Sequence, residues 1–136
     1  MKIISLLKRE VSRQFYKFAL VGTECAVLNY LVFLILLYHL SVNYLISAGL
    51  GALFGIAFGF VFNKMYSFNS KRDVKVEVIP YFLVYLTSFL FMIIALRIMV
   101  NNLGLIPLIA NALILPVTTM INFFGQKIFV FKNKRW

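Results

Sequence analysis

The chain has few acidic residues, one cysteine and one histidine, and each shortage argues against a class of function. Asp and Glu number 4 against 14 Lys and Arg in 136 residues, and charged residues make up only 13% of the chain. A soluble domain carries about a quarter. Cys25 cannot form an intramolecular disulfide, and His39 has no second histidine for a metal cluster. We therefore expect neither an enzyme nor a bound metal or cofactor.

Long apolar runs are what the sequence has in abundance, since 62% of its residues are hydrophobic. A helix crosses a bilayer core of about 30 Å with about 20 residues. The runs of that length are 18–40, 44–62, 81–100 and 105–124. Because the links after the first and third runs are very short, the chain is predicted to be all-α, a polytopic membrane protein with four transmembrane helices in two tandem hairpins.

The basic residues lie in three blocks, namely the N-terminal segment 1–17, the loop 63–80 and the tail 125–136, whereas the two short hairpin links carry none. Excess Lys and Arg mark the cytoplasmic side of a membrane protein. We therefore predict that both termini are cytoplasmic and that 18–136 forms a single four-helix transmembrane domain. Anionic lipid, and not nucleic acid, is the partner expected for the net charge of +10.

Segment 1–17 has an amphipathic helical pattern. Ile4, Leu7 and Val11 fall on one side of a helix, while Lys2 and Arg9 fall on another. Such a segment either lies on the headgroups before the chain turns inward or simply caps the first span.

The two halves of the chain also resemble each other. A shift of 63 positions aligns 18–21 with 81–84, and 63–68 with 126–131. Each half would then be one hairpin that enters and leaves the membrane on the same side. In transporters, the interface between such repeats often holds the substrate.

Small residues recur at every fourth position of the second predicted span, at Ser47, Gly51, Gly55 and Gly59. Such a row lets another helix backbone approach closely within lipid. It predicts helix packing inside the bundle, or else a contact between subunits or a groove for a lipid chain. Because four helices enclose little volume, we expect a homodimer.

Two ionisable residues lie inside the predicted spans, where a charge is costly and commonly functional. Glu24 would bind a proton, a cation or a sugar hydroxyl, or would form a local ion pair with Lys17. Arg97, near the outer end of the third span, would either snorkel to the interface or contact a phosphate.

Polar and helix-bending residues inside the spans indicate which helix faces point inward. Amides such as Asn29 and Asn122 need partners within the bundle, and Gly22, Cys25 and Asn29 share one helix face that is predicted to point inward. Pro116 is predicted to bend the fourth helix, and such bends sometimes border a cavity.

The second and fourth spans end in the same pattern, an amide residue, a lysine and alternating aromatics. Aromatic residues favour the membrane interface, and lysine lies at phosphate depth. The repetition predicts a paired clamp for a lipid headgroup. Its residues are the amides Asn63 and Gln126, the lysines Lys64 and Lys127, and the aromatics Tyr66, Phe68, Phe129 and Phe131.

With these motifs the chain resembles the GtrA-like family of small four-span membrane proteins. The resemblance covers about 14–131, through an opening at 15–22 and closing motifs at 63–68 and 122–131. It implies flipping of a polyprenyl-phosphate-linked monosaccharide across a bacterial or archaeal cytoplasmic membrane, for cell-surface polysaccharide synthesis or glycosylation. Lysine stands where the family usually has arginine, and it offers a point charge in place of a fork.

On this resemblance the expected ligand-binding residues form two groups. The phosphate would be held by Lys64 and Lys127 inside and received by Arg97 outside. The path of the sugar and isoprenoid would comprise Glu24, Asn29, Asn63, Tyr66, Asn122, Gln126 and Phe129. We also consider a membrane glycosyltransferase as a partner.

Two other functions stay open. Small multidrug exporters also have four spans and a glutamate in their first helix, so Glu24 would couple protons to cation export. A scaffold that anchors a glycosyltransferase through its basic surface would transport nothing.

Overall fold

The computed structural model describes residues 1–132, and the secondary structure in this range is helical, which confirms the predicted all-α class. The elements are α1 (Lys2–Leu34), η1 (Ile35–His39), α2 (Tyr44–Phe62), η2 (Asn63–Ser67), α3 (Val74–Asn101), α4 (Pro107–Gly125) and η3 (Gln126–Val130), where η marks a π-helical turn. Four helical segments within the described range are long and apolar enough to cross a membrane, as predicted. The basic tail residues Lys134 and Arg135 lie outside the described residues.

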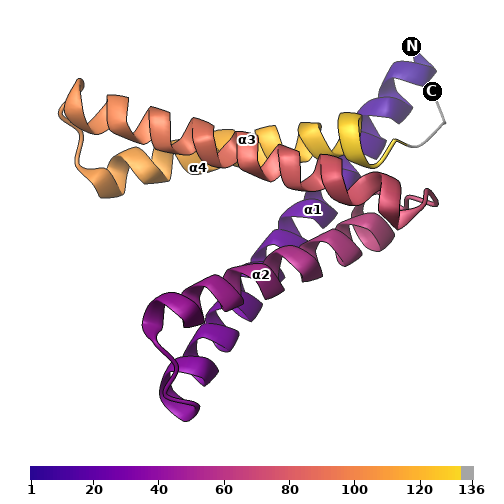
Figure 1. The fold of residues 1–136 in the computed structure, drawn as a ribbon. Helices are drawn as coiled ribbons and strands as arrows, with labels where there is room; N and C mark the ends of the chain where they lie inside the picture. The colour runs from indigo at the N-terminus through magenta and orange to yellow at the C-terminus, as the bar shows by residue number, and fades with distance from the viewer. Residues whose placement is uncertain (133–136) are drawn as a thin grey trace. The chain divides into compact units, whose positions relative to one another are not determined.

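The chain forms two compact units, Met1–Ser70 and Lys71–Trp136. The first unit contains the α1–α2 hairpin and the second contains the α3–α4 hairpin (Figure 1). The boundary between them agrees with the sequence repeat, which also assigns one hairpin to each half. That the four helices form a single domain stays a prediction.

The repeat has a direct structural counterpart in two aromatic pairs. In the first unit the rings of Phe18 and Phe68 have centroids 6.2 Å apart and planes at 59°. In the second unit Tyr81 and Phe131, 63 positions further along, are 6.3 Å apart at 55°. Each pair joins the first helix of a hairpin to the segment that follows its second helix, so the two units close in the same way.

A further match at the same shift was not recognised from the sequence. Lys8-Arg9-Glu10-Val11 aligns with Lys71-Arg72-Asp73-Val74. In the second unit this segment begins a helix, because the carboxylate of Asp73 accepts a hydrogen bond from the Lys75 amide at 3.1 Å and caps α3. In the first unit it lies within α1. Helix α1 is therefore extended at its N-terminus relative to α3.

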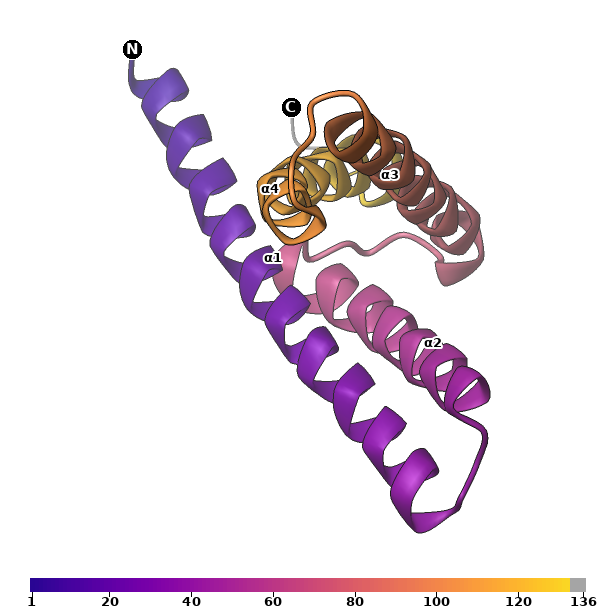
Figure 2. The same ribbon diagram turned by 90° about the vertical axis from the view of Figure 1, so that its left-hand side faces the viewer.

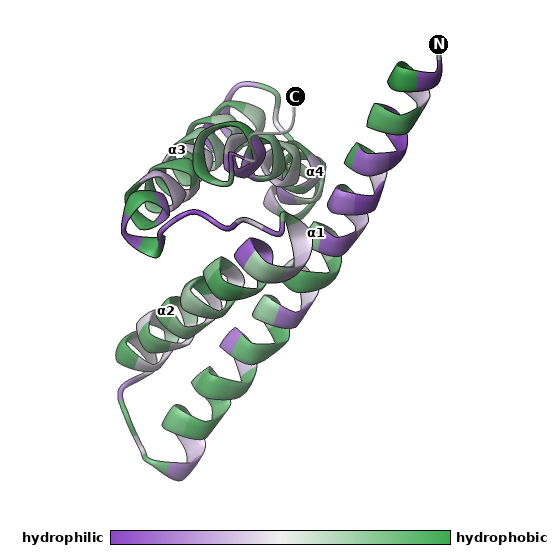
Figure 3. Cartoon of the chain, turned by 90° about the vertical axis from the view of Figure 1, so that its right-hand side faces the viewer, coloured by the Kyte–Doolittle hydropathy of each residue, from purple (hydrophilic) through white to green (hydrophobic). Residues whose placement is uncertain are grey.

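Helix α1 runs without interruption from Lys2 to Leu34 (Figure 2). Residues 2–17 are thus the first turns of the spanning helix and do not form a separate helix followed by a turn. Hydrophilic residues lie mainly on these N-terminal turns of the α1–α2 hairpin, and hydrophobic residues cover most of its remainder (Figure 3).

The loop expected at 63–80 is shorter than the apolar pattern indicated. Helical structure continues through η2 to Ser67 and resumes at Val74, which leaves 68–73 as the connection. The reason is physical: a helix needs only its own backbone hydrogen bonds, so it can continue past the apolar run that identifies a span.

In the first unit Gly51 and Gly55, the two central residues of the small-residue row on α2, face α1. A Cβ atom on Gly51 would lie 2.6 Å from Oδ1 of Asn29, and one on Gly55 would lie 3.2 Å from the Cys25 carbonyl oxygen. These contacts are within the hairpin. Gly22, which was predicted to share the inward face of Cys25 and Asn29, is exposed and would have nothing within 4 Å of an added Cβ atom.

The second unit has its closest contact elsewhere. A Cβ atom on Gly125 would lie 2.7 Å from a methyl group of Val84, at the end of α4 next to η3. Further along the hairpin, the hydroxyl of Ser88 donates to the Thr118 carbonyl at 3.5 Å. Helix α4 continues through Pro116.

Candidate functional site

Both amide–lysine–aromatic motifs form a π-helical turn, which the sequence did not predict. The Phe68 amide donates to the Asn63 carbonyl at 2.9 Å, and the Phe131 amide donates to the Gln126 carbonyl at 2.8 Å. Each bond spans five residues in place of the four of an α-helix. Such wide turns are rare and occur frequently at functional sites.

The amide side chains that begin these turns are buried. Asn63 is 2% exposed and Gln126 is 0% exposed, and the Ser67 hydroxyl donates to Oδ1 of Asn63 at 2.9 Å. Asn122 lies one turn before Gln126, and its Oδ1 is buried without a hydrogen-bond partner among the described residues. Of the amides predicted to lie along a sugar path, Asn63 and Gln126 are buried inside the π turns, and Asn122 lies in the last turns of α4.

The lysines of the motif come next. Lys64 and Lys127 each occupy the second position of a π turn and are half-buried. Matching positions in the two repeats thus carry a cation beside a buried amide.

A second cation lies at the far end of each turn. In the first unit Nζ of Lys17 donates to the Tyr66 carbonyl at 3.3 Å and lies 4.5 Å from the centre of the Tyr66 ring. In the second unit the guanidinium of Arg72 donates to the Val130 carbonyl at 3.3 Å. The last carbonyls of a helix lack intrahelical donors and carry partial negative charge, so a cation is favourable there.

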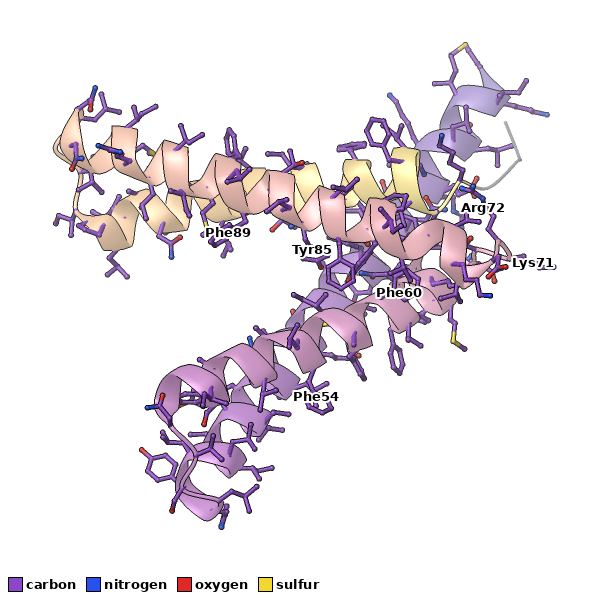
Figure 4. The ribbon with its side chains drawn as sticks, in the orientation of Figure 1. Phe54, Phe60, Lys71, Arg72, Tyr85 and Phe89 are labelled. Atoms are coloured by element: carbon purple, nitrogen blue, oxygen red, sulfur yellow. The ribbon has the colours of Figure 1, made fainter. Side chains whose placement is uncertain are left out.

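Arg72 and Lys71 project from the segment that precedes α3 (Figure 4). The sequence pattern predicted no role for Arg72, and it predicted for the Lys17 side chain only an ion pair with Glu24. The alignment of 8–11 with 71–74 was the signal that could have drawn attention to Arg72. Each unit therefore brings two basic side chains to the end of its hairpin, Lys17 with Lys64 and Arg72 with Lys127.

The four aromatics of the motif divide into two classes, although all four were predicted to lie at the interface. Tyr66 is 45% exposed and Phe129 is 62% exposed, whereas Phe68 and Phe131 are buried. The buried pair fails to reach the surface because each ring packs on an aromatic residue of the first helix of its own hairpin. Only Tyr66 and Phe129 present ring surface to a ligand.

The polar residues predicted inside the spans are not brought together. Glu24 is exposed on α1, while Asn29 is half-buried against Gly51. The ammonium of Lys17 faces Tyr66, so the local ion pair considered between Lys17 and Glu24 does not form. Arg97 is exposed one turn before the end of α3.

Glu77 is a buried ionisable residue that the sequence analysis did not single out. It lies in the first turn of α3 and is 0% exposed. Acidic side chains are almost never fully buried unless they are paired. Its counterpart in the first repeat is Gln14, so the two halves place an acid and its amide analogue at the same position.

The comparison with known families agrees with this organisation. A family model described as "GtrA/DPMS, transmembrane domain" matches residues 17–131, which include both hairpins and both closing motifs. No curated protein and no solved structure matches the chain.

Proposed function

The chain belongs to the GtrA/DPMS transmembrane family, and on that premise we propose that it flips a polyprenyl-phosphate-linked monosaccharide across a bacterial or archaeal cytoplasmic membrane. The product would serve cell-surface polysaccharide synthesis or glycosylation. The observation that carries the proposal is the duplicated π turn with two basic side chains at each hairpin end. A multi-pass membrane protein of four spans is the setting in which such a lipid would be handled.

The chemistry required is to move a charged, hydroxyl-rich headgroup through hydrocarbon. Unassisted, this costs many kcal/mol, because ionised and polar groups are poorly solvated there. In the proposal Lys64 and Lys127 hold the phosphate on the cytoplasmic side, where the basic segments place both chain termini. The exposed rings of Tyr66 and Phe129 would stack on the sugar or its lipid, and Arg97 would meet the phosphate at the outer leaflet.

The remaining residues of the predicted path have narrower roles in the proposal. Glu24 is exposed on α1 and would accept hydrogen bonds from sugar hydroxyls. Asn63 and Gln126 would act by holding the π turns in shape, because their side chains are buried, and Asn29 would act through its contact with Gly51 between α1 and α2. The side-chain oxygen of Asn122 is buried without a hydrogen-bond partner among the described residues, so it would meet a sugar hydroxyl only after the helices shift. None of these groups implies bond-making chemistry, so the proposed activity is transport.

The decisive experiment measures how quickly a labelled polyprenyl-phosphate sugar becomes accessible on the opposite leaflet of proteoliposomes. We expect acceleration by the purified protein, and loss of most of it in the Lys64→Ala, Lys127→Ala double variant. Lys75→Ala, which removes an exposed lysine outside the π turns, is the matched control. Liposomes whose flipping rate is unchanged by the wild-type protein would rule out the transporter.

The same assay separates the competing functions. A cation exporter would lose activity on Glu24→Gln and would tolerate loss of Lys64 and Lys127, while a scaffold would co-purify with a glycosyltransferase without moving lipid.

We propose a membrane glycosyltransferase, anionic lipid and a second copy of the chain as partners. Because Gly51 and Gly55 face α1 within the first unit, a homodimer would use a different surface.

A further inference from the structure

The second unit has an apolar groove between α3 and the α4–η3 segment. Its volume is about 500 Å³, which is within the range of about 300–1,000 Å³ typical of small-molecule sites. Val84 and Gly125, which touch at the closest point of the hairpin, belong to its lining. The full lining is Pro80, Leu83, Val84, Thr87, Ile121, Phe124, Gly125, Ile128 and Phe129.

The groove lies directly beside the closing motif. Ile128 and Phe129 line it and belong to η3, the π turn that also contains Lys127. Thr87 is the one lining residue with a polar side chain, and its hydroxyl already donates to the Leu83 carbonyl at 2.8 Å. The surface is therefore suited to hydrocarbon along its length, and the π turn that lines it also carries a lysine, Lys127.

The repeat permits a comparison with the corresponding surface of the first unit. There Phe62 replaces Gly125, and its ring stacks on Phe58 with centroids 4.1 Å apart. Phe58 itself replaces Ile121. A large ring thus stands where the second unit has no side chain at all.

The other end of that surface also differs. Lys17 replaces Pro80, and Tyr66 replaces Phe129, and the two side chains contact each other through the cation–π pair. Glu24 replaces Thr87. A charged carboxylate and an ammonium group are poor neighbours for a hydrocarbon chain, so the first unit lacks the apolar character that makes the groove in the second.

We infer that the groove of the second unit holds the polyprenyl chain of the transported lipid, and that the first unit provides no equivalent chain site. The inference rests on the proposed function for the identity of the lipid. The groove is in a hairpin apolar enough to span the bilayer, and a hydrocarbon chain matches the apolar chemistry of its lining. Lys127 beside it fits the phosphate that follows such a chain.

Aromatic side chains strengthen the choice of occupant. Phe124 and Phe129 are 45% and 62% exposed along the groove, and their faces provide contact area for a methyl-branched, unsaturated chain through dispersion. The two repeats therefore have different roles: both provide cations for the lipid headgroup, but only the second hairpin binds the polyprenyl chain.

The test is photolabelling of the full-length protein in liposomes by a polyprenyl phosphate with a diazirine midway along its chain, followed by peptide mapping. We expect label within 80–87 and 121–129, in excess over the repeat-matched segments 17–24 and 58–66. Even labelling of both hairpins, or equal labelling by a straight-chain phosphatidic acid with the same diazirine, would overturn the inference.

Matched variants sharpen the assignment. Leu83→Trp fills the groove from an exposed position and should lower the labelling yield about tenfold, the change that corresponds to 1.4 kcal/mol of binding. Leu20→Trp, its counterpart in the first unit, should leave the yield unchanged. Ile128→Trp and its counterpart Met65→Trp repeat the comparison from the other wall, in case one variant fails to fold. Equal effects within each pair contradict the inference.

Two further outcomes separate this inference from its premise. If label is confined to the groove but the protein moves no lipid, the chain site stands and the transport proposal fails. If lipid is moved but both hairpins are labelled alike, the proposed function stands and the chain site fails. A photoreactive benzoylphenylalanine at position 83 should crosslink to lipid, and a crosslinked pair of protein chains would instead assign the groove to a second copy.

Discussion

The two hairpins close in the same way but are packed tightly at different places. In the first, α2 comes close to the C-terminal third of α1: a Cβ atom on Gly51 would lie 2.7 Å from the Asn29 carbonyl oxygen, and one on Gly55 would lie 3.2 Å from the Cys25 carbonyl oxygen. In the second, the glycine that leaves no room for a side chain is Gly125, beside the π turn, where an added Cβ atom would lie 2.7 Å from a side-chain methyl group of Val84. A glycine lets two helices approach closely only at its own position. The position of the glycine in each helix therefore decides where the two helices of the hairpin are closest and which part of their surface stays exposed.

The charges of the two hairpins have diverged as well. The first has Glu24 within its span and Gln14 at the position of Glu77, while the second has Thr87 within its span and a buried acid at the start of α3. The closing motifs, in contrast, keep an amide, a lysine and two aromatics. The duplicated features thus belong to the closing motifs, whereas the divergent ones are an exposed position within the span, Glu24 against Thr87, and a buried position at the start of α3, Glu77 against Gln14.

The largest effect should follow from breaking the tight contact of the first hairpin. Gly51→Ala places a methyl group 2.6 Å from Oδ1 and 2.7 Å from the carbonyl oxygen of Asn29, so α1 and α2 must separate. We expect a loss of about 3 kcal/mol in the free energy of unfolding, the upper end of typical overpacking costs. Unfolding in detergent micelles followed by circular dichroism measures it.

Gly22→Ala is the control for that prediction, since an added methyl group there has nothing within 4 Å. Its unfolding free energy should equal or slightly exceed that of the wild type, because alanine favours a helix more than glycine does. Similar losses in both variants would show that the α1–α2 contact does not set the stability of the hairpin.

The next largest effect concerns the two lysines at matching positions. If the chain site lies in the second unit, Lys127 is closer to the lipid phosphate than Lys64 is. Lys127→Ala should therefore weaken polyprenyl-phosphate binding about tenfold, and Lys64→Ala should weaken it less. Binding isotherms of both variants in nanodiscs test this, and a larger effect at Lys64 would reverse the assignment.

A smaller loss of stability is expected from removing the N-cap of α3, a helix start that the first repeat does not have. Asp73→Ala removes the side chain that caps α3, and a lost cap costs about 1 kcal/mol. Glu10→Ala, at the matching position inside α1, should have little effect because no helix begins there. Thermal unfolding of the two variants provides the comparison.

The smallest effect should come from the cation–π pair of the first unit. Lys17→Met keeps the length of the side chain but removes the contact with the Tyr66 ring and carbonyl, at a cost of about 0.5–1 kcal/mol. Tyrosine fluorescence of η2 should change with it. Lys8→Met, an exposed lysine of the same helix, should change neither quantity.

Several features of this protein could be predicted from its sequence alone. Helix number and approximate spans follow from hydropathy, because a bilayer imposes a minimum apolar length on each helix. The division into two hairpins follows from short links, and the repeat follows from residue identity. The closing motifs around Lys64 and Lys127 could be found in the same way, since similar residues at a fixed shift can be recognised without coordinates.

Other features required the tertiary structure, since they depend on which atoms meet. The burial of Phe68 and Phe131 follows from their packing on Phe18 and Tyr81, and the cations at the ends of the π turns come from residues far away in the sequence. The groove of the second unit depends on the space left beside Gly125. Hydropathy fixes how much of the chain lies in lipid, but only the packing of helix against helix decides which side chains are left at the surface to bind something.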